Sequence, residues 1–408
     1  MTLSYRDFLT RYGSPLYVYE LAEVRRAYAT LRAALPMPSD LYYSVKANPH
    51  PLLVRELVAL GCKPEASSSG ELEVALAAAG DPAAILYTGP AKSRLEIELA
   101  LRRGVRRFSV ESPWDCAKVE AAAKRIGAVA EVLVRVNPEM STRRTGLQMS
   151  GAVSQFGTDL NAITERSHAF ESGGSVRVIG VHCYMGTNVM DVDALVEGFA
   201  TALDSAVRAA SALGISLQAI DLGGGFGHPF ACRGMPCDIG ALRPTLERLF
   251  DAYLPAWRHG EPRLSFESGR FLVAAAGTLI ATVEDVKSSG GTRFVVLDTG
   301  INHLAGATSI GRTLRPEIEV MSLETGDLDP CRVAGPLCTP IDLLSSRARL
   351  PLGLKPGDPV WIPNVGAYGL SASLLAFLSR ACPAELVLDE GIVREASRVE
   401  FGRIGLCL

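Results

Sequence analysis

The feature that most constrains the fold is an alternation of strand-like and helical segments between residues 40 and 270. Eight short segments are rich in apolar and β-branched residues, and alanine- and leucine-rich helical stretches separate them. The strand-like segments are 41–45, 63–66, 84–87, 107–110, 132–137, 178–183, 219–222 and 264–267. Eight strand–helix repeats are typical of a (β/α)8 TIM-like barrel, so we predict an α/β fold for this part of the chain.

The pattern changes after Phe271. Short strand-like runs then follow one another with glycine and proline turns and little helix, at 281–286, 293–298, 317–321, 331–333, 359–362 and 385–388. This predicts a second, mainly antiparallel β-domain. A further run at 15–19 precedes the barrel and is expected to join it. We therefore predict a barrel at 25–272 and a β-domain formed by 1–24 and 273–408.

Composition narrows the classes of function. The chain is 48% hydrophobic and carries a net charge of -3, so it is expected to be globular and to bind no nucleic acid. The longest apolar run, 271–283, is too short to span a bilayer, and residues 1–12 show no signal-peptide core. The nine cysteines are scattered and form no CxxC pair, which favours the cytoplasm. Cys232 and Cys237 are expected to be loop thiols, and no metal site is predicted.

Polar residues stand at the ends of the predicted barrel strands, which is where such barrels carry their chemistry. The candidates are Lys46, Glu65, Arg135, His182, Tyr184, Asp221, Glu267 and Arg270. Any one of them has an ordinary structural explanation. Their gathering at one end of one barrel predicts a site.

Lys46 ends the first strand-like run, and Asn48-Pro49 stops that run. A buried lysine loses its ammonium proton easily and can then attack an aldehyde to form a Schiff base. A lone lysine at a strand end is usually a surface residue. Here the company of the other strand-end residues favours a catalytic role.

A triple-glycine turn follows the seventh strand-like run. Without Cβ atoms, the backbone N–H groups of such a turn can face an anion, and Thr187 and Arg270 could add contacts to the same phosphate. Glu267 lies three residues before Arg270, where it is either a satisfied structural acid or the partner of a ring nitrogen. A lysine for an aldehyde, a phosphate cradle and a carboxylate for a pyridinium nitrogen together predict a pyridoxal 5'-phosphate site.

These motifs resemble the fold-type III pyridoxal-phosphate-dependent decarboxylases, the diaminopimelate/ornithine decarboxylase family. The matching pieces are Tyr43-Ser44-Val45-Lys46-Ala47-Asn48, the segment 65–72, Arg135-Val136-Asn137-Pro138, the segment 154–157, the triple glycine, Glu267-Ser268-Gly269-Arg270, Gly335-Pro336-Leu337-Cys338 and Gly366-Ala367-Tyr368-Gly369. They extend from residue 43 to 369, and their combination is far more specific than any one of them.

The resemblance implies roles for these residues. Lys46 would carry the cofactor as an internal aldimine, Glu267 would pair with the pyridinium nitrogen, and Glu65 and Arg135 would form a supporting acid–arginine pair. Cys338 and Asp342 would enter the active site of the other subunit of a head-to-tail homodimer, where Cys338 protonates the α-carbon after carbon dioxide leaves. The phosphate would be held by Gly223, Gly224, Gly225, Gly269, Arg270 and Tyr368.

Two departures from the family pattern concern the ring and the substrate. Tyr184 stands where the family stacks a histidine on the cofactor ring, and a tyrosine ring can also stack. Thr339 follows Cys338 where diaminopimelate decarboxylases have a glutamate that reads the distal end of the substrate. The segment 298–304, which contains His303, resembles theirs, but residues 305–311 displace the arginine expected next, before Arg312 and Arg315.

The sequence Cys-Thr-Pro-x-Asp and this insertion resemble the siderophore and natural-product branch, whose members act on larger or carrier-linked amino acids. The predicted substrate residues are Thr339, Asp342, His303, Arg312 and Arg315. We expect a pyridoxal-phosphate-dependent decarboxylase acting on an amino acid or an amino-acid-derived precursor.

Three alternatives stay open. One is the diaminopimelate decarboxylase of lysine biosynthesis. An amino-acid racemase of the same plan would, by family analogy, place an arginine against the ring nitrogen, which Glu267 argues against. A non-catalytic relative of ornithine decarboxylase is disfavoured because Lys46, the triple glycine and Cys338 are all present.

Overall fold

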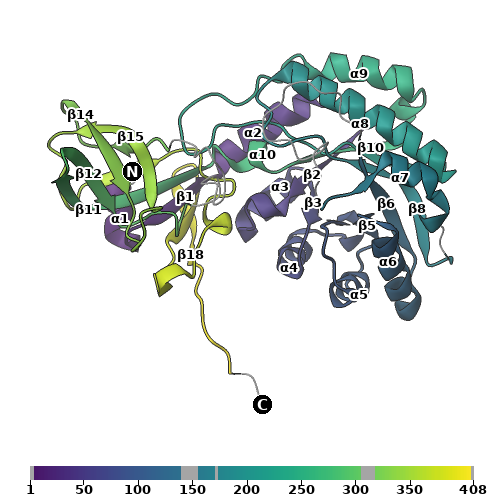
Figure 1. The fold of residues 1–408 in the computed structure, drawn as a ribbon, viewed down its shortest axis with the longest axis horizontal. Helices are drawn as coiled ribbons and strands as arrows, with labels where there is room; N and C mark the ends of the chain where they lie inside the picture. Colours follow the sequence, from purple (N-terminus) through teal and green to yellow (C-terminus); the bar gives the residue numbers. More distant parts are fainter. Residues whose placement is uncertain (1–3, 139–154, 171–172, 305–317, 406–408) are drawn as a thin grey trace. The chain divides into compact units, whose positions relative to one another are not determined.

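The computed structural model describes residues 4–138, 155–170, 173–304 and 318–405 (Figure 1). The chain divides into two compact units. One, the barrel unit, comprises 25–228 and 236–272, and the other, the β-unit, comprises 1–24, 229–235 and 273–408. Residues 229–235, which lie within the predicted barrel range, group with the β-unit.

The barrel unit is built on eight parallel strands that close into a ring. In chain order they are β2 (Asp40–Ser44), β3 (Lys63–Ala66), β4 (Leu86–Tyr87), β5 (Arg107–Val110), β6 (Ala130–Asn137), β8 (Val176–Cys183), β9 (Ala219–Asp221) and β10 (Arg263–Ser268). They pair in the order β5-β4-β3-β2-β10-β9-β8-β6, and β6 pairs back with β5. A two-residue strand, β7 (Thr158–Asp159), extends the sheet beside β6. The predicted (β/α)8 barrel is confirmed.

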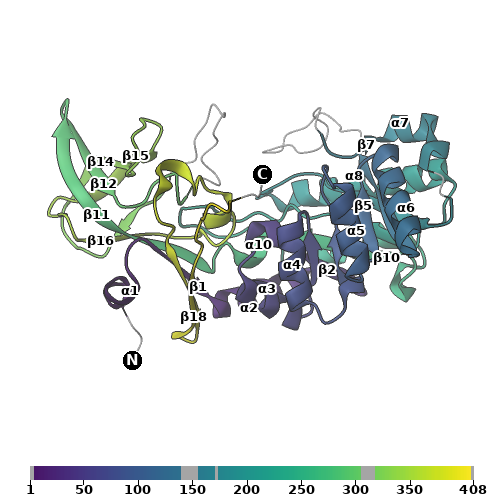
Figure 2. The ribbon, with the colours of Figure 1, turned by 90° about the horizontal axis from the view of Figure 1, so that it is seen from below.

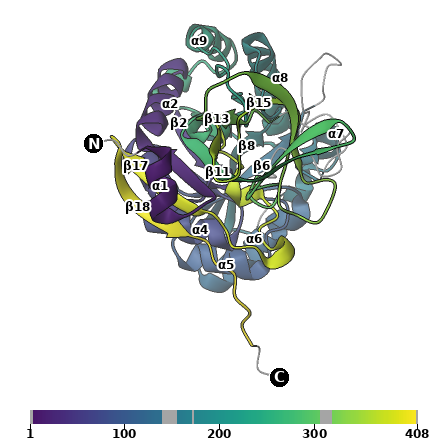
Figure 3. The ribbon, with the colours of Figure 1, turned by 90° about the vertical axis from the view of Figure 1, so that its left-hand side faces the viewer.

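Helices lie around the outside of these strands (Figure 3). They are α2 (Leu21–Ala34), α3 (Pro51–Ala59), α4 (Ser69–Ala78), α5 (Arg94–Arg102), α6 (Pro113–Ile126), α7 (Leu160–Glu165), α8 (Val192–Leu213), α9 (Leu242–Tyr253) and α10 (Arg270–Val273). Short 3-10 turns occur at η1 (Val45–Ala47), η2 (Pro82–Ala84), η3 (Ser167–Phe170) and η4 (Trp257–His259).

Side-chain caps fix where the outer helices begin. Ser68, Ser93, Ser112 and Asp191 each accept a backbone N–H from the first turn of the helix that follows, which satisfies a donor that has no partner within the helix. Ser68 and Ser112 come two residues after β3 and β5 end, so the loops that follow these two strands are short.

An apolar layer fills the middle of the barrel. Tyr42, Leu86, Leu133 and Ala219 pack together there with Ile179. The first four come from the first, third, fifth and seventh barrel strands, which is the way TIM barrels build an interior layer from alternate strands. This layer closes the barrel below the polar residues described next.

The β-unit consists of strands β1 (Leu16–Glu20), β11 (Gly277–Ser289), β12 (Thr292–Leu297), β13 (Met321–Ser322), β14 (Leu328–Ala334), β15 (Leu343–Pro351), β16 (Pro359–Ile362), β17 (Ala384–Asp389) and β18 (Ile392–Arg398). Helix α1 (Tyr5–Tyr12) and the turns η5 (Leu370–Ala372) and η6 (Phe377–Ser379) complete it. Figure 2 shows β11 as its long strand. The strand order is β15-β14-β12-β11-β1-β17-β18, with β16 pairing β11 and β13.

The sheet is mainly antiparallel, as predicted, with parallel pairs only at β1–β17 and β12–β14 among the described strands. The N-terminal strand joins it by pairing antiparallel with β11, which confirms that expectation. The strand predicted at 317–321 is wrong over most of its length: only Met321 pairs, within β13, and residue 317 lies outside the described ranges. Strands β15 and β18 were not predicted.

Two expectations about the chain as a whole can be compared with the described residues. No helix among them is both long and apolar enough to cross a membrane. Cys232 and Cys237 are unpaired thiols, as expected, and the other described cysteines are also free.

Candidate active site

Two polar layers lie above the apolar layer of the barrel. The apolar layer takes one residue from each of the first, third, fifth and seventh barrel strands. Because side chains alternate along a strand, the residue two positions further on in each of these strands also faces inward. These residues are Ser44, Thr88, Arg135 and Asp221. The even strands contribute Glu65, Ser109, His182 and Glu267. All eight are polar, and all except the half-buried Arg135 are buried. The C-terminal end of the barrel is therefore lined by groups that need partners or a ligand.

Lys46 and Glu65 form an ion pair at the mouth of the barrel. Lys46 lies in η1, directly after β2, and its Nζ is 3.3 and 3.2 Å from the two carboxylate oxygens of Glu65. Glu65 also accepts hydrogen bonds from the hydroxyls of Ser67 and Thr88. Burial alone would raise the pKa of Glu65, but the Lys46 ammonium and hydrogen bonds from Ser44 and Thr88 lower it to about 2. The Lys46 side chain is 45% exposed rather than buried as expected, so one side of it is open.

Arg135 makes its ion pair with a residue that the sequence did not single out. Its Nη1 is 3.2 Å from Oε1 of Glu111, which follows β5, and its guanidinium lies over the Phe156 ring at 4.9 Å and near the Tyr184 ring at 6.0 Å. Within the described structure Glu65 pairs with Lys46 and Arg135 with Glu111, so the predicted Glu65–Arg135 pair is not formed.

Three buried ionisable groups meet in the barrel interior. One ring nitrogen of His182 and one carboxylate oxygen each of Asp221 and Glu267 lie within 4.8 Å of one another. Burial raises the pKa of Glu267 well above its usual value, with the nearby Glu65 and Asp221 adding to the effect. Burial likewise raises the pKa of Asp221, to about 6, and lowers that of His182 well below its usual value. Low-dielectric surroundings thus favour the neutral forms of all three.

The glycine turn packs against the neighbouring strand ends. Gly223 has φ +66, and its N–H donates to Oδ1 of Asp221 at 2.8 Å. A Cβ on Gly223 would lie 2.8 Å from Cδ2 of Tyr184, and one on Gly224 would collide with the backbone oxygen of Glu267. The turn therefore requires glycine, and it brings its backbone beside both Tyr184 and Glu267.

The other predicted cofactor residues of the barrel unit follow the same strand ends. Thr187 is half-buried in the loop after β8, close to Tyr184 in sequence. Gly269 separates β10 from α10, and a Cβ there would lie 2.7 Å from Cβ of Ala47, next to Lys46. Arg270 is the first residue of α10. Their placement at the end that carries Lys46 and Glu267 is the one that the sequence predicted.

These residues fit pyridoxal phosphate on structural grounds. Oε1 of Glu267 is buried and has no hydrogen-bond partner among the described residues. A buried carboxyl oxygen without a partner is costly, so Glu267 needs a further hydrogen-bond donor, from a neighbouring side chain or from a bound group. The half-exposed Lys46 and a glycine turn that tolerates no Cβ supply an amine and a close-approach backbone at the same end of the barrel.

In the β-unit, Cys338 lies on an exposed loop between β14 and β15. Asp342 holds this loop from below: its two carboxylate oxygens accept the N–H groups of Ile301 at 2.8 Å and Leu337 at 2.7 Å. A Cβ on Gly300 or Gly335 would collide with the same carboxylate. Burial raises the pKa of Asp342, while the two backbone donors oppose the rise. Asp342 thus ties the Cys338 loop to the segment that begins after β12.

His303 is held within the β-unit. Its Nδ1 lies 3.2 Å from the Thr299 hydroxyl, and its Nε2 lies 2.9 Å from Nδ2 of Asn302 and 3.1 Å from the backbone oxygen of Ala381. Burial lowers its pKa to about 4. Both ring nitrogens therefore have protein partners, which indicates that His303 supports its loop.

The remaining predicted residues of the β-unit are Thr339, Tyr368, Arg312 and Arg315. Thr339 is partly buried beside Cys338, and its N–H donates to the backbone oxygen of Leu337 at 2.8 Å. Tyr368 is half-buried and has φ +56, an uncommon conformation for a residue with a side chain. Arg312 and Arg315 lie outside the described residues.

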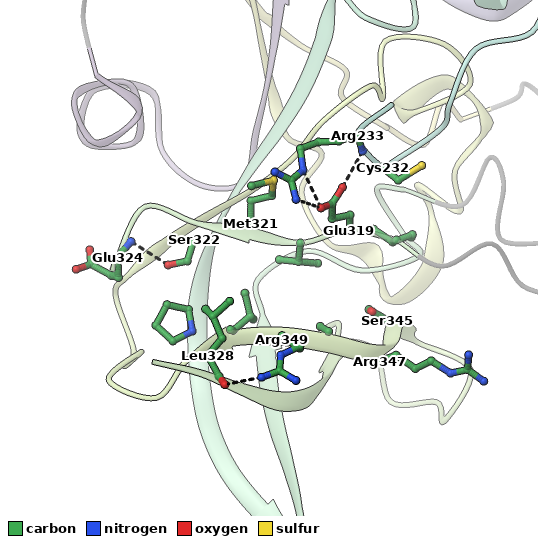
Figure 4. A pocket seen from close by; sticks show the side chains of 15 residues that line it. Cys232, Arg233, Glu319, Met321, Ser322, Glu324, Leu328, Ser345, Arg347 and Arg349 are labelled. Atoms are coloured by element: carbon green, nitrogen blue, oxygen red, sulfur yellow. Dashed lines mark hydrogen bonds and ion pairs between the residues drawn. The ribbon is translucent and has the colours of Figure 1, made fainter. Parts of the chain in front are cut away.

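A pocket of about 630 Å³ opens in the β-unit along β15 (Figure 4). Its wall carries the ion pair of Arg233 with Glu319, at 2.6 Å, and Arg349, which donates to the backbone oxygen of Leu328 at 3.1 Å. None of the predicted site residues that the structure describes lines it. Its polar groups are largely matched to one another, unlike those at the end of the barrel.

Sequence reasoning missed several members of the barrel site. Ser109, Thr88 and Glu111 were not singled out, and His182 and Asp221 were noted but given no role. The pleat supplies the missing signal for four of these five, because Ser109, Thr88, His182 and Asp221 occupy the inward-facing polar positions of the strand ends.

Comparison with known proteins agrees with this architecture. Residues 21–274 match the pyridoxal-binding domain of the pyridoxal-dependent decarboxylases. The chain is 33% identical over 389 residues to the decarboxylase of the L-glutamyl-BtrI acyl-carrier protein from Niallia circulans, covering 93% of this chain and 90% of that protein. It is 31% identical over 402 residues to diaminopimelate decarboxylase from Neisseria meningitidis serogroup B, covering 95% and 91%. Diaminopimelate decarboxylase from Helicobacter pylori, solved with L-lysine, superposes with a TM-score of 0.83 at 26% identity, covering 96% of this chain and 95% of that one.

The barrel, the β-sheet unit and the strand-end cluster define a fold-type III enzyme. The chain belongs to the pyridoxal-dependent decarboxylase family, and it is a pyridoxal-phosphate-dependent amino-acid decarboxylase.

Proposed function

We propose that this enzyme decarboxylates an extended amino-acid substrate, one whose amino acid is carried on a larger group, in a siderophore or other natural-product pathway. The observation that carries this is Thr339, which follows Cys338 where diaminopimelate decarboxylases are expected to have a glutamate. A site without that carboxylate leaves the distal ammonium of diaminopimelate desolvated and unpaired, which costs binding energy. The similarity to a decarboxylase whose substrate is attached to a carrier protein supports the same conclusion.

The residues of the barrel unit would hold the cofactor. Lys46 would be its attachment point, with Glu65 fixing the lysine side chain at 3.2 Å. Glu267 would hydrogen-bond the ring nitrogen, and Tyr184 would lie against the ring. The turn formed by Gly223, Gly224 and Gly225 would lie against the phosphate together with Arg270, and the N–H groups of Gly224 and Gly225 would face it. When bound, pyridoxal phosphate supplies an electron sink for the electrons left on the α-carbon as carbon dioxide departs.

The β-unit would supply the proton. Cys338 is exposed on a loop that Asp342 holds through Leu337 and ties to Ile301, so its thiol can be presented to a site that this unit does not itself contain. We propose that this site belongs to the other subunit of a homodimer, and that the Cys338 thiol delivers a proton to the α-carbon there. Tyr368, from the same unit, would contribute to phosphate binding.

The test is a comparison of kcat/KM for carbon dioxide release. The substrates are meso-diaminopimelate, ornithine, lysine, condensed citryl-amide precursors and L-glutamate linked to a carrier protein. We expect a condensed or carrier-linked substrate to exceed meso-diaminopimelate by at least about tenfold, the scale set by one unmet polar contact. A clear preference for free meso-diaminopimelate contradicts the proposal and leaves the decarboxylase assignment intact.

A second experiment isolates the residue that carries the argument. Thr339→Glu restores the carboxylate, and Thr339→Gln is the matched control of equal length without charge. We expect Thr339→Glu alone to raise kcat/KM for meso-diaminopimelate by about tenfold. Equal effects of the two substitutions would show that charge at this position does not select the substrate.

Diaminopimelate decarboxylation is the second candidate function. It is favoured by the 31% identity to the Neisseria enzyme over 95% of the chain. The substrate comparison above decides between the two, because both predict carbon dioxide release and they differ only in which amino acid is preferred.

A further inference from the structure

His182 occupies a position in the barrel that the proposed cofactor contacts do not explain. It lies in β8, is 2% exposed, and pairs in register with Arg135 on one side and Asp221 on the other. Its ring reaches two strands that are not neighbours of β8. Nδ1 lies 2.8 Å from the hydroxyl of Ser109 on β5, and Nε2 lies 3.4 Å from Oε1 of Glu267 on β10. The imidazole therefore crosses the barrel interior and connects three strands of one polar layer.

The contact with Glu267 joins two buried polar atoms that lack other hydrogen-bond partners among the described residues. His182 Nε2 and Glu267 Oε1 are both buried, and neither has a hydrogen-bond partner among the described residues. A buried polar atom without a partner is rare and costly. At 3.4 Å the two atoms are close enough to share one proton through a small rotation of either side chain.

The contact with Ser109 allows Nε2 to carry the proton of the neutral ring. A serine hydroxyl can donate to Nδ1, and a neutral imidazole that accepts at Nδ1 carries its hydrogen on Nε2. The charged neighbours Arg135, Lys46 and Lys92 add to burial in disfavouring the imidazolium, and Glu65 opposes them. A neutral ring with Nε2–H directed at Glu267 is then the form that stabilises a carboxylate there.

We infer that His182 is the positioning residue of Glu267: Ser109 fixes its tautomer, and its Nε2–H holds one carboxylate oxygen so that the other remains for the cofactor. The oxygen of Glu267 that faces His182 is Oε1, which leaves Oε2 as the one for the cofactor. A carboxylate held at one oxygen cannot rotate away from its partner, and it stays ionised more readily than an unsupported buried acid. This inference rests on the proposed role of Glu267 at the ring nitrogen.

A pair of substitutions separates positioning from packing. The amide of His182→Gln can occupy the place of Nε2 and still donate to Glu267, whereas that of His182→Asn lies near the place of Nδ1 and reaches only Ser109. The exposed His168, replaced by asparagine, is the control for histidine loss in general. We expect His182→Asn to lower kcat by about tenfold or more with little change in KM, and His182→Gln to recover most of that loss.

Two readouts do not depend on turnover. The absorbance spectrum of the bound cofactor, followed against pH, should be displaced in His182→Asn and close to wild type in His182→Gln. In cofactor-loaded enzyme labelled with 15N-histidine, the His182 signal, identified by its loss in His182→Asn, should show a protonated Nε2, and Glu267→Gln should shift it. There are six histidines in the chain, so the signal is resolvable by difference.

The double variant completes the test. If His182 acts through Glu267, His182→Asn should have little further effect on kcat in the Glu267→Gln background. Equal losses in both backgrounds, or a spectrum and kcat that match wild type in His182→Asn, overturn the inference. A metal ion bound stoichiometrically in the purified protein and lost in His182→Asn would also overturn the inference, because His182, Asp221 and Glu267 would then be metal ligands. If Glu267→Gln itself leaves decarboxylation unchanged while the 15N shift responds, the proposed role of Glu267 fails and the His182–Glu267 contact stands.

Discussion

Replacing Glu65 with glutamine should lower the free energy of unfolding of the cofactor-free protein at neutral pH and make it less sensitive to a fall in pH. Glu65 is fully buried, and its partners lower its pKa from the ordinary 4.5 to about 2. A carboxylate whose folded-state pKa lies below its unfolded-state value contributes stability above the unfolded-state pKa. That contribution is lost as the pH falls from about 4.5 toward about 2.

The size of the effect follows from the shift. Lowering the pKa of Glu65 from 4.5 to about 2, at about 1.36 kcal/mol per pH unit, corresponds to about 3 kcal/mol of folding free energy at neutral pH. We expect a smaller measured loss, about 2 kcal/mol, for two reasons. Glutamine can still accept hydrogen bonds from Ser67 and Thr88, and the half-exposed Lys46 ammonium regains water when its partner disappears.

The assay is urea unfolding of wild type and Glu65→Gln at several pH values between 7 and 3, using the difference between the proteins so that other carboxylates cancel. The control is Glu73→Gln, which removes an exposed ion pair with Arg103 and should cost less than about 1 kcal/mol at every pH. For Glu65→Gln the difference should shrink as the pH falls below about 4.5. A difference that stays constant down to pH 3, or that is absent at pH 7, refutes the reasoning.

Three further predictions concern the active site. Lys46→Ala should fold but show no borohydride-trapped cofactor and essentially no turnover; trapping on another lysine in the wild type contradicts its role. Asp342→Asn should leave cofactor binding intact and lower kcat several-fold, because the loop that carries Cys338 loses a charged anchor for two backbone N–H groups; an unchanged kcat would show that this anchor is dispensable. Mixing inactive Lys46→Ala and Cys338→Ala subunits should restore up to roughly a quarter of wild-type activity, since about half the dimers would be mixed and each would hold one intact site; no recovery despite proven subunit exchange would place Cys338 in the site of its own chain.

The barrel was predictable because its signal is local and repeated. Most strands are short apolar or β-branched runs followed by a helix, and several of these helices begin at a side-chain cap. The predicted 63–66 and 107–110 coincide with β3 and β5. The β-unit was harder to read. Strand β15 contains Ser345, Arg347 and Arg349, and the side chains of β18 are at best half-buried, so neither stands out as an apolar run. These strands exist because neighbours pair with them.

The sequence predicted which residues belong to the site better than it predicted which of their side chains contact one another. Lys46, Glu267 and the glycine turn were found from their strand-end positions, and the structure places them at one end of the barrel. The partner of Arg135 was not found, because Glu111 belongs to the preceding repeat and the pairing of β5 with β6 brings the two side chains together. The same holds for His182, whose contacts come from strands on both sides of β8.

The anchored loop at Cys338 has a consequence for how such enzymes change substrates. Asp342 holds Leu337 within the loop and ties the loop to Ile301 of the segment after β12. Pro340 and Ile341, between Leu337 and Asp342, are exposed. Mutations in the middle of the loop can therefore accumulate without displacing the backbone that carries Cys338, the proposed proton donor. Selection for a new substrate can therefore act on a few solvent-facing positions of this loop. The residues at the C-terminal end of the barrel need not change at the same time.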